Sequence, residues 1–238
     1  MTPNSLPTSP PGSPSASESI RLENLHFRYP NADSGTLAGI NLAIRRGESV
    51  GIIGPSGSGK STLIDVILGL LEPASGRVLV DGEDIRASLP AWQRRIGYVQ
   101  QDIYLLDDTI RRNIAFGVAD ADVDESRLSD AVRAANLEPV IECFHKGLET
   151  VIGNRGILLS GGQRQRIAIV RALYTQPGVL GLDEATSALD NETENEVVEA
   201  IDRLRGERTI MIIAHRLSTL RGCERLYRLV NGRIEPDA

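Results

Sequence analysis

The sequence of 238 residues has few cysteines and no long apolar run, and each shortage excludes a class of protein. Its two cysteines, Cys143 and Cys223, show no CxxC or Cys/His spacing, which argues against a disulfide framework and against a zinc site. The apolar run at 63–71 contains Asp65 and is far shorter than the ~20 residues that span a bilayer. We therefore expect reduced thiols and no membrane helix in these residues.

A strong excess of one charge is also missing. The 32 acidic and 26 basic residues give a formal charge of −6, so there is no overall electrostatic reason to bind nucleic acid or an anionic membrane. A hydrophobic share of 41% is enough for a sizeable core at this length. Residues 1–19 are rich in Pro and Ser and lack the pattern of a signal peptide, so we interpret them as a disordered tail or linker.

The remaining chain alternates short apolar runs with helical stretches. Period-two alternation or continuous apolarity predicts strands, and the spacing of the later ones is typical of βαβ units with a parallel sheet. Between them, a long segment with few β-branched runs is expected to be a helical insertion. The expected strands lie within 19–30, 35–44, 49–53, 77–85, 178–187 and 208–215, with helices from near Lys60, over 107–174 and over 187–205.

The run GPSGSGKS, residues 54–61, matches the P-loop pattern between a predicted strand and a predicted helix. Gly54 and Gly59 allow tight turns, so that the N–H groups between them can face phosphate oxygens. Lys60 supplies positive charge for the β and γ phosphates, and Ser61 a hydroxyl for Mg²⁺. This pattern predicts nucleotide binding but not the reaction.

Two later strands end in groups that suit phosphoryl transfer. Asp183 and Glu184 follow one apolar run and His215 follows the next, so parallel pairing brings all three to the same sheet edge. Taken alone, the acids resemble a helix cap and the histidine a strand end. Beside a P-loop, we interpret Asp183 as a metal ligand, Glu184 as facing a water, and His215 as a γ-phosphate contact.

Five runs, in this order, closely resemble the ATP-binding domain of ABC transporters: GPSGSGKST, YVQQD, LLSGGQRQR, LGLDEATSALD and IIAHR. The resemblance covers residues 20–235. It implies an α/β fold: a RecA-like P-loop NTPase core with a mixed, mainly parallel sheet, a small antiparallel β subdomain and a helical signature-motif subdomain at about 102–172. It also implies that the ligands are ATP and Mg²⁺.

The resemblance assigns roles position by position. Tyr29 would stack on adenine, Thr62 would support the α phosphate, and Asp190 would read the site of a second subunit. Glu184 would be the general base and His215 the γ-phosphate switch, with Gln101 and Lys60 as the other catalytic residues. Ser61, Gln101 and Asp183 would hold Mg²⁺. The implied nucleotide site comprises Tyr29, Gly54, Pro55, Ser56, Gly57, Ser58, Gly59, Lys60, Ser61, Thr62, Gln101, Ser160, Gly161, Gly162, Gln163, Asp190 and His215.

The run LLSGGQ, residues 158–163, looks like a second phosphate cradle, although the P-loop already serves one phosphate. The resemblance resolves this duplication. It implies that two copies, or two related chains, pair head to tail around two ATPs. Ser160 and Gly162 of one chain would then close on the γ phosphate bound at Lys60 of the other, with the positive end of the following helix directed at it.

Residues 104–117 and 149–163 resemble the coupling segments of exporter-type domains. We therefore expect an ATPase of an exporter or flippase, on the cytoplasmic side of the membrane, with a transmembrane partner that is fused or separate and with no nucleic acid partner. DNA-repair ABC ATPases need a long coiled coil that is missing between Lys60 and Ser160, and translation-associated ones carry two such domains. A regulator without hydrolysis is disfavoured by Glu184 and His215.

Three positions depart from the family pattern: Gln100 replaces proline, Asn154 replaces an acidic residue, and Gly181 replaces a branched apolar residue. We expect Asn154 to weaken a charge contact with the membrane partner. A glycine in a buried strand removes a side chain from the core, so we expect Gly181 to loosen the strand and slow hydrolysis relative to valine. We interpret Trp92, His26, His145 and Met211 as packing or surface residues, because no other candidate site residues accompany them. We interpret the charge run at 194–208 as the solvated face of a helix.

Overall fold

A computed structural model describes residues 18–32, 34–185, 191–214 and 216–237. Asp190 and His215, two of the expected nucleotide contacts, lie outside these ranges. None of the helices in these ranges combines the length and the apolar character of a membrane span.

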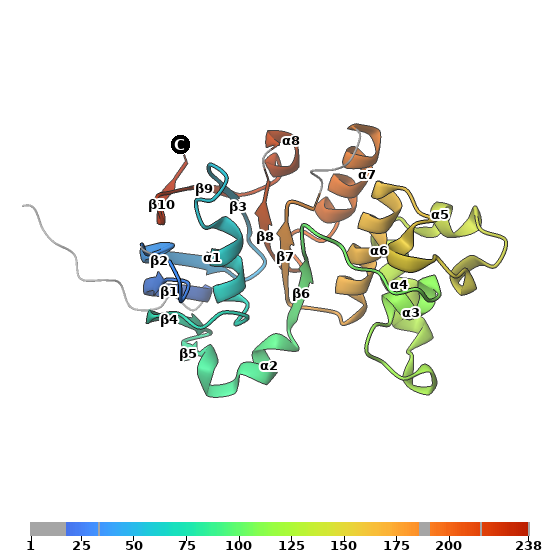
Figure 1. The fold of residues 1–238 in the computed structure, drawn as a ribbon, viewed down its shortest axis with the longest axis horizontal. Helices are drawn as coiled ribbons and strands as arrows, with labels where there is room; N and C mark the ends of the chain where they lie inside the picture. Colours follow the sequence, from blue (N-terminus) through green and yellow to red (C-terminus); the bar gives the residue numbers. More distant parts are fainter. Residues whose placement is uncertain (1–17, 33, 186–190, 215, 238) are drawn as a thin grey trace, which may run out of the picture.

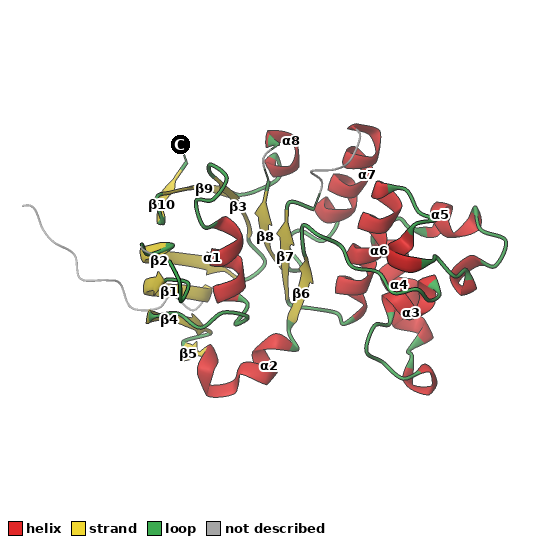
Figure 2. Cartoon of the chain, in the orientation of Figure 1, coloured by secondary structure: helices red, strands yellow, loops and turns green. Residues whose placement is uncertain are grey.

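The centre of the fold is a six-stranded sheet of order β10-β9-β3-β8-β7-β6, in which only β10 runs antiparallel to its neighbour. Figure 2 shows β3, β8, β7 and β6 between α1 (Lys60–Ile67) and the helices on the right, with β9 and β10 at the upper left. Three of them, β3, β7 and β8, confirm strands expected from apolar runs, whereas β6, β9 and β10 were not anticipated. The strands are β3 Ser49–Ile53, β6 Ile96–Val99, β7 Val179–Asp183, β8 Thr209–Ile213, β9 Arg225–Val230 and β10 Arg233–Pro236.

A four-stranded antiparallel sheet of order β2-β1-β4-β5 forms the expected small β subdomain, on the left of Figure 1. Asp81 and Gly82 form its β4–β5 turn with φ of 51° and 89°, as a tight hairpin requires. Helix α1, Lys60–Ile67, lies between the two sheets and packs into a core shared by both. The strands are β1 Glu18–Phe27, β2 Leu37–Arg45, β4 Ser75–Val80 and β5 Glu83–Asp84.

The chain between β6 and β7 is helical, as expected, and forms the right side of Figure 1. Its 14-residue helix α6 packs against α3 and α4 and against the sheet. The helices there are α3 Ile110–Ile114, η2 Asp120–Asp122, α4 Glu125–Ala134, α5 Glu138–Glu142, η3 Gly147–Glu149, η4 Asn154–Gly156 and α6 Gly161–Tyr174. The others are η1 Ile85–Ser88, α2 Leu89–Gln93, α7 Asn191–Asp202 and α8 Leu217–Leu220.

The central strands bury both faces, which explains why their sequences are apolar throughout. On β8, Ile210 and Ile212 join the core on the helical side, while Met211 and Ile213 join the core around α1. The same period of two places alternate residues of β7 on opposite faces. Gly181 and Asp183 therefore share the face of β7 that is directed at α1.

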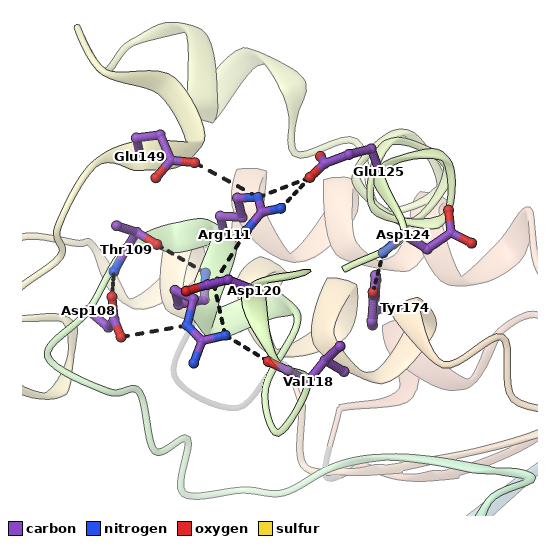
Figure 3. A network of polar contacts seen from close by, with 10 residues as sticks. Asp108, Thr109, Arg111, Val118, Asp120, Asp124, Glu125, Glu149 and Tyr174 are labelled. Atoms are coloured by element: carbon purple, nitrogen blue, oxygen red, sulfur yellow. Dashed lines mark hydrogen bonds and ion pairs between the residues drawn. The ribbon is translucent and has the colours of Figure 1, made fainter. Parts of the chain in front are cut away.

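An arginine of α3 ties the helical region together (Figure 3). Arg111 pairs with Glu125 of α4 and lies 3.9 Å from a carboxylate oxygen of Glu149 in η3. Asp120 lies 3.6 Å from Arg111 and 3.0 Å from Arg112. Because these three acids are well exposed, each ion pair is expected to contribute at most about 1 kcal/mol.

Helix α7 corrects the interpretation of 194–208 as a solvated charge run. Glu194 is only 3% exposed and accepts hydrogen bonds from Ser218 Oγ at 2.7 Å and Thr219 Oγ1 at 3.0 Å, and it also pairs with Arg216. Glu196 pairs with Arg166 of α6. The first turns of α7 are thus joined to the segment that follows residue 215 and to helix α6. Trp92, in contrast, is the packing residue that we expected, with its indole N–H bonded to Ile67 O.

Candidate functional site

The P-loop forms at the transition from strand to helix, where β3 ends at Ile53 and α1 begins at Lys60. Glycine is required here because Gly54 and Gly59 have φ of 154° and 101°, and a Cβ on Gly54 would lie 2.2 Å from Leu229 O. Lys60 Nζ donates to Gly54 O and Pro55 O, both at 3.0 Å. Its ammonium group is therefore held inside the loop that it is expected to share with phosphate.

A cavity of about 500 Å³ opens over this loop. It brings together residues from distant parts of the sequence that were expected to meet a nucleotide. Its lining residues are Tyr29, Thr36, Ser56, Gly57, Gly59, Lys60, Ser61, Thr62, Gln101 and Glu184. Residues 160–163 of the signature motif are not among these described lining residues, so the two phosphate cradles of one chain do not form a single cavity.

Glu184 is held in an unusual backbone conformation at the end of β7. Its φ of 49° lies in the left-handed region, which costs a non-glycine residue about 1–2 kcal/mol. The conformation is stabilised by a bond from Glu184 N to Ile213 O at 2.9 Å. The carboxylate reaches the cavity, where Gln101 Nε2 donates to its Oε2 at 2.8 Å. The site thus places a carboxylate and an amide in contact beside the P-loop.

Asp183 has the surroundings expected of a cation ligand. It is 4% exposed, and its Oδ1 has no hydrogen-bond partner among the described residues. Burial raises the pKa of its carboxyl, against a hydrogen bond with Ser61 that lowers it, while the charges of Glu184 and Asp65 raise it further. A buried carboxylate oxygen without a donor, next to a hydroxyl, fits Mg²⁺. Among the described residues, no group of three or more His, Cys, Asp or Glu is placed to hold a metal ion by itself.

Tyr29 lies just after β1 at the edge of the cavity. Its ring contacts Phe27 edge-on, with centroids 4.9 Å apart, and its hydroxyl lies 3.2 Å from Thr62 Oγ1. The residue is 43% exposed. An aromatic ring that is anchored at both ends yet open to solvent offers a surface on which a base can stack.

The signature motif begins α6. Ser160 and Gln163 form a reciprocal capping box: Gln163 N donates to Ser160 Oγ at 3.2 Å, and Ser160 N donates to Gln163 Oε1 at 2.9 Å. Ser160 is exposed, and its neighbour Gly162 is buried. The motif therefore presents a capped helix start that does not line the chain's own P-loop cavity.

Sequence reasoning missed two polar residues behind the site, Asp65 of α1 and Tyr98 of β6. Tyr98 Oη donates to Asp65 Oδ1 at 3.2 Å. Burial, together with the charges of Asp65 and Asp183, raises the pKa of this hydroxyl. The signal that could have revealed them is Gly181, which is the register partner of Tyr98. The expectation that Gly181 leaves the core short of a side chain is wrong, because a Cβ there would lie 3.3 Å from the Tyr98 ring.

The two expected coupling segments, 104–117 and 149–163, lie side by side. Ile110 N donates to Thr150 O at 3.0 Å, and Ile152 N donates to Asp108 O at 3.1 Å. Both segments expose large apolar side chains, each with 52–76% of its surface accessible. On these segments they are Tyr104, Phe116, Val151, Ile157 and Leu158.

Comparison with known proteins is consistent with this site. The family model described as "ABC transporter" matches residues 37–187. An ATP-dependent lipid A-core flippase from Syntrophus aciditrophicus is 47% identical over 222 residues, which cover 93% of this chain and 36% of the flippase. The mouse protein "ATP-binding cassette sub-family B member 10, mitochondrial" is 45% identical over 218 residues, covering 90% of this chain and 30% of that protein.

Among solved structures, that of a bacterial Atm1-family ABC exporter with ATP bound superposes with a TM-score of 0.84 at 35% identity. The match covers 97% of this chain and 40% of the exporter chain. The chain thus spans about a third of the length of the curated relatives named above.

Proposed function

The chain belongs to the ABC transporter family, as an ATP-binding domain with the P-loop NTPase fold, and on that premise we propose that it hydrolyses ATP to drive an exporter or flippase. The observation that carries the proposal is the cavity over the P-loop. There Lys60, Ser61, Gln101 and Glu184 converge from three separate parts of the sequence. One relative reported above is named a flippase and the solved structure is that of an exporter, whereas none of the three is named a DNA-repair or translation ATPase, which favours transport over the alternative.

The roles of these side chains follow from their chemistry. Lys60 would exchange its bonds to Gly54 O and Pro55 O for bonds to the β and γ phosphate oxygens. Glu184, oriented by the amide of Gln101, would accept a proton from the attacking water. Mg²⁺, held by Ser61, Gln101 and Asp183, would neutralise charge on the phosphates. Catalysis would then consist of positioning and charge stabilisation without a covalent intermediate.

A second copy, or a related chain, would complete each site. The capped start of α6, with Ser160 exposed, lies away from the cavity of its own chain, so it is available to the γ phosphate held by a partner. Asp190 and His215, which lie outside the described residues, are proposed to contact the same composite site. Loss of the γ phosphate on hydrolysis would then release the partner.

The transmembrane partner would bind where the two coupling segments meet. Tyr104, Phe116 and Val151 expose apolar surface of the kind that marks an interaction site, and hydrogen bonds join the two segments there. Such a partner would hold the domain at the cytoplasmic side of a membrane. Asn154 lies in the same region, where an acidic side chain is usual in the family.

The proposal is tested by ATP binding and hydrolysis with the purified 238-residue chain. Lys60→Ala is expected to abolish both, whereas Glu184→Gln is expected to bind ATP and hydrolyse almost none. Lys146 is the only other lysine in the sequence and is exposed, so Lys146→Ala is the matched control. Equal activity of the Lys60 and Lys146 variants would refute the assignment of the site. Stimulation of hydrolysis by DNA would favour the alternative of a non-transport ATPase.

A further inference from the structure

Tyr98 and Gly181 form a complementary pair across strands β6 and β7. They are register partners, and a Cβ on Gly181 would lie 3.3 Å from Tyr98 Cδ2, 3.5 Å from Leu68 Cδ1 and 3.6 Å from Ile64 Cγ2. The tyrosine ring therefore covers the strand surface that the glycine leaves bare, an arrangement that stabilises glycine in a sheet. A residue at position 181 with side-chain atoms beyond Cβ would have to displace the ring.

This placement carries the tyrosine hydroxyl to α1. Its Oη donates to Asp65 Oδ1 at 3.2 Å, and within the described part of the chain no other side chain is a hydrogen-bond donor to Asp65. Asp65 lies one helical turn after Ser61, so both point from the same face of α1. Asp183 lies two residues after Gly181, on the face of β7 that is directed at α1.

Two carboxylates, Asp65 and Asp183, thus share the space between α1 and β7 with one serine and one tyrosine. The Ser61 hydroxyl acts on Asp183, and the Tyr98 hydroxyl donates to Asp65 at 3.2 Å while it also lies near Asp183. Without the tyrosine hydroxyl, Asp65 would be a half-buried carboxylate in need of a donor. Asp65 would then compete with Asp183 for the hydroxyl of Ser61, which lies one helical turn away.

We propose that Tyr98 is a positioning residue for the magnesium and nucleotide site: by satisfying Asp65, it leaves Ser61 free to orient Asp183. Neither Tyr98 nor Asp65 is among the described residues that line the nucleotide cavity, so both act through Ser61 and Asp183. This inference rests on the proposed function, since that function assigns Mg²⁺ to Ser61 and Asp183. Gly181, at first sight a defect of β7, is what makes room for the ring that delivers the hydroxyl.

The test measures how binding of trinitrophenyl-ATP to the full chain depends on Mg²⁺ concentration. Tyr98→Phe keeps the ring against Gly181 and removes only the hydroxyl. It is expected to raise the Mg²⁺ concentration for half-maximal binding by about tenfold, as loss of an outer-shell partner does at other metal sites, and to leave binding in EDTA unchanged. Tyr174→Phe removes the hydroxyl of another buried tyrosine, which accepts from Asp124 N at 3.0 Å, so it is the matched control and should change neither.

Variants of Asp65 separate positioning from packing. Asp65→Ala removes the carboxylate that would compete for the Ser61 hydroxyl, so it should leave the Mg²⁺ dependence close to wild type. In the double variant it should reverse the shift caused by Tyr98→Phe. Asp65→Asn keeps an acceptor for Tyr98 and should remain close to wild type.

A wild-type Mg²⁺ dependence in Tyr98→Phe, or a double variant that keeps the full shift, would overturn the inference and leave the proposed function intact. Failure of the wild-type chain to bind the nucleotide in a Mg²⁺-dependent way would instead overturn the proposed function, and the inference with it.

Discussion

Replacing Gly181 by valine is expected to destabilise the domain, although valine is the better strand former. Two opposing contributions to the free energy of unfolding decide whether the substitution stabilises or destabilises the domain. Removing the glycine lowers the conformational entropy of the unfolded chain, which stabilises by about 0.4–1 kcal/mol. Against this, the new Cβ would already lie 3.3 Å from the Tyr98 ring, and the two methyl groups would extend beyond it toward Leu68 and Ile64.

Overpacking of this kind in a filled core costs about 1–3 kcal/mol. The net loss is therefore expected to be about 1–2 kcal/mol, which corresponds to a fall in Tm of roughly 2–8 °C for a domain of this size. Gly181→Ala adds only the Cβ, so the gain and the crowding nearly cancel and its Tm should stay close to wild type.

The assay is thermal unfolding of Gly181→Val, Tyr98→Ala and the double variant, followed by circular dichroism. Because the valine would occupy space that the lost ring vacates, the double variant should be more stable than the sum of the two single losses by at least about 1 kcal/mol. A Gly181→Val variant that melts above wild type, or losses that simply add, would refute the view that Tyr98 fills this face of the strand.

Three further outcomes follow from particular contacts. Burial raises the pKa values of the Glu48 and Glu194 carboxyls, but hydrogen bonds from arginine and other donors together outweigh it, so both pKa values are lowered from the ordinary 4.5. Each group therefore stabilises the fold above about pH 4.5, and a pH series of unfolding free energies should fall as the pH drops below that value. Glu194→Ala should cost about 1–3 kcal/mol in chemical unfolding by leaving its buried donors unpaired, while Glu199→Ala, at an exposed position of the same helix, should be nearly neutral. Tyr29→Ala should weaken ATP binding about tenfold in calorimetry by removing a stacking surface, and Tyr29→Phe should retain most of the affinity; equal losses in both variants would exclude stacking.

Local sequence was sufficient to predict much of the fold and the residues that gather around the P-loop. The strand at 49–53 is bounded as expected, because a run of apolar residues followed by a glycine loop has few other solutions. Glu184 and Gln101 could be brought together from sequence only through the order of the family's motifs. The 2.8 Å bond between them and the left-handed backbone at Glu184 needed the three-dimensional structure.

What sequence could not predict depends on contacts between distant segments. From sequence, Gly181 predicted a weakened strand. The ring that fills its space belongs to Tyr98, which lies 83 residues earlier and contacts Gly181 only because β6 pairs with β7. Glu194 suggested a solvated helix face because its partners follow residue 215. Strand β6 was missed since its four residues, Ile96–Val99, are too few to show a period.

The central claim, that two copies share each ATP, is tested most directly by the mass of Glu184→Gln in solution, measured by sedimentation with Mg²⁺-ATP and with Mg²⁺-ADP. A dimer is expected with ATP and a monomer with ADP, because the γ phosphate is the group that both chains would bind. Adding Ser160→Arg to this variant should preserve ATP binding at the P-loop and abolish the dimer. A monomer at saturating ATP, or an equally stable dimer when Ser160 is replaced, would contradict the shared site.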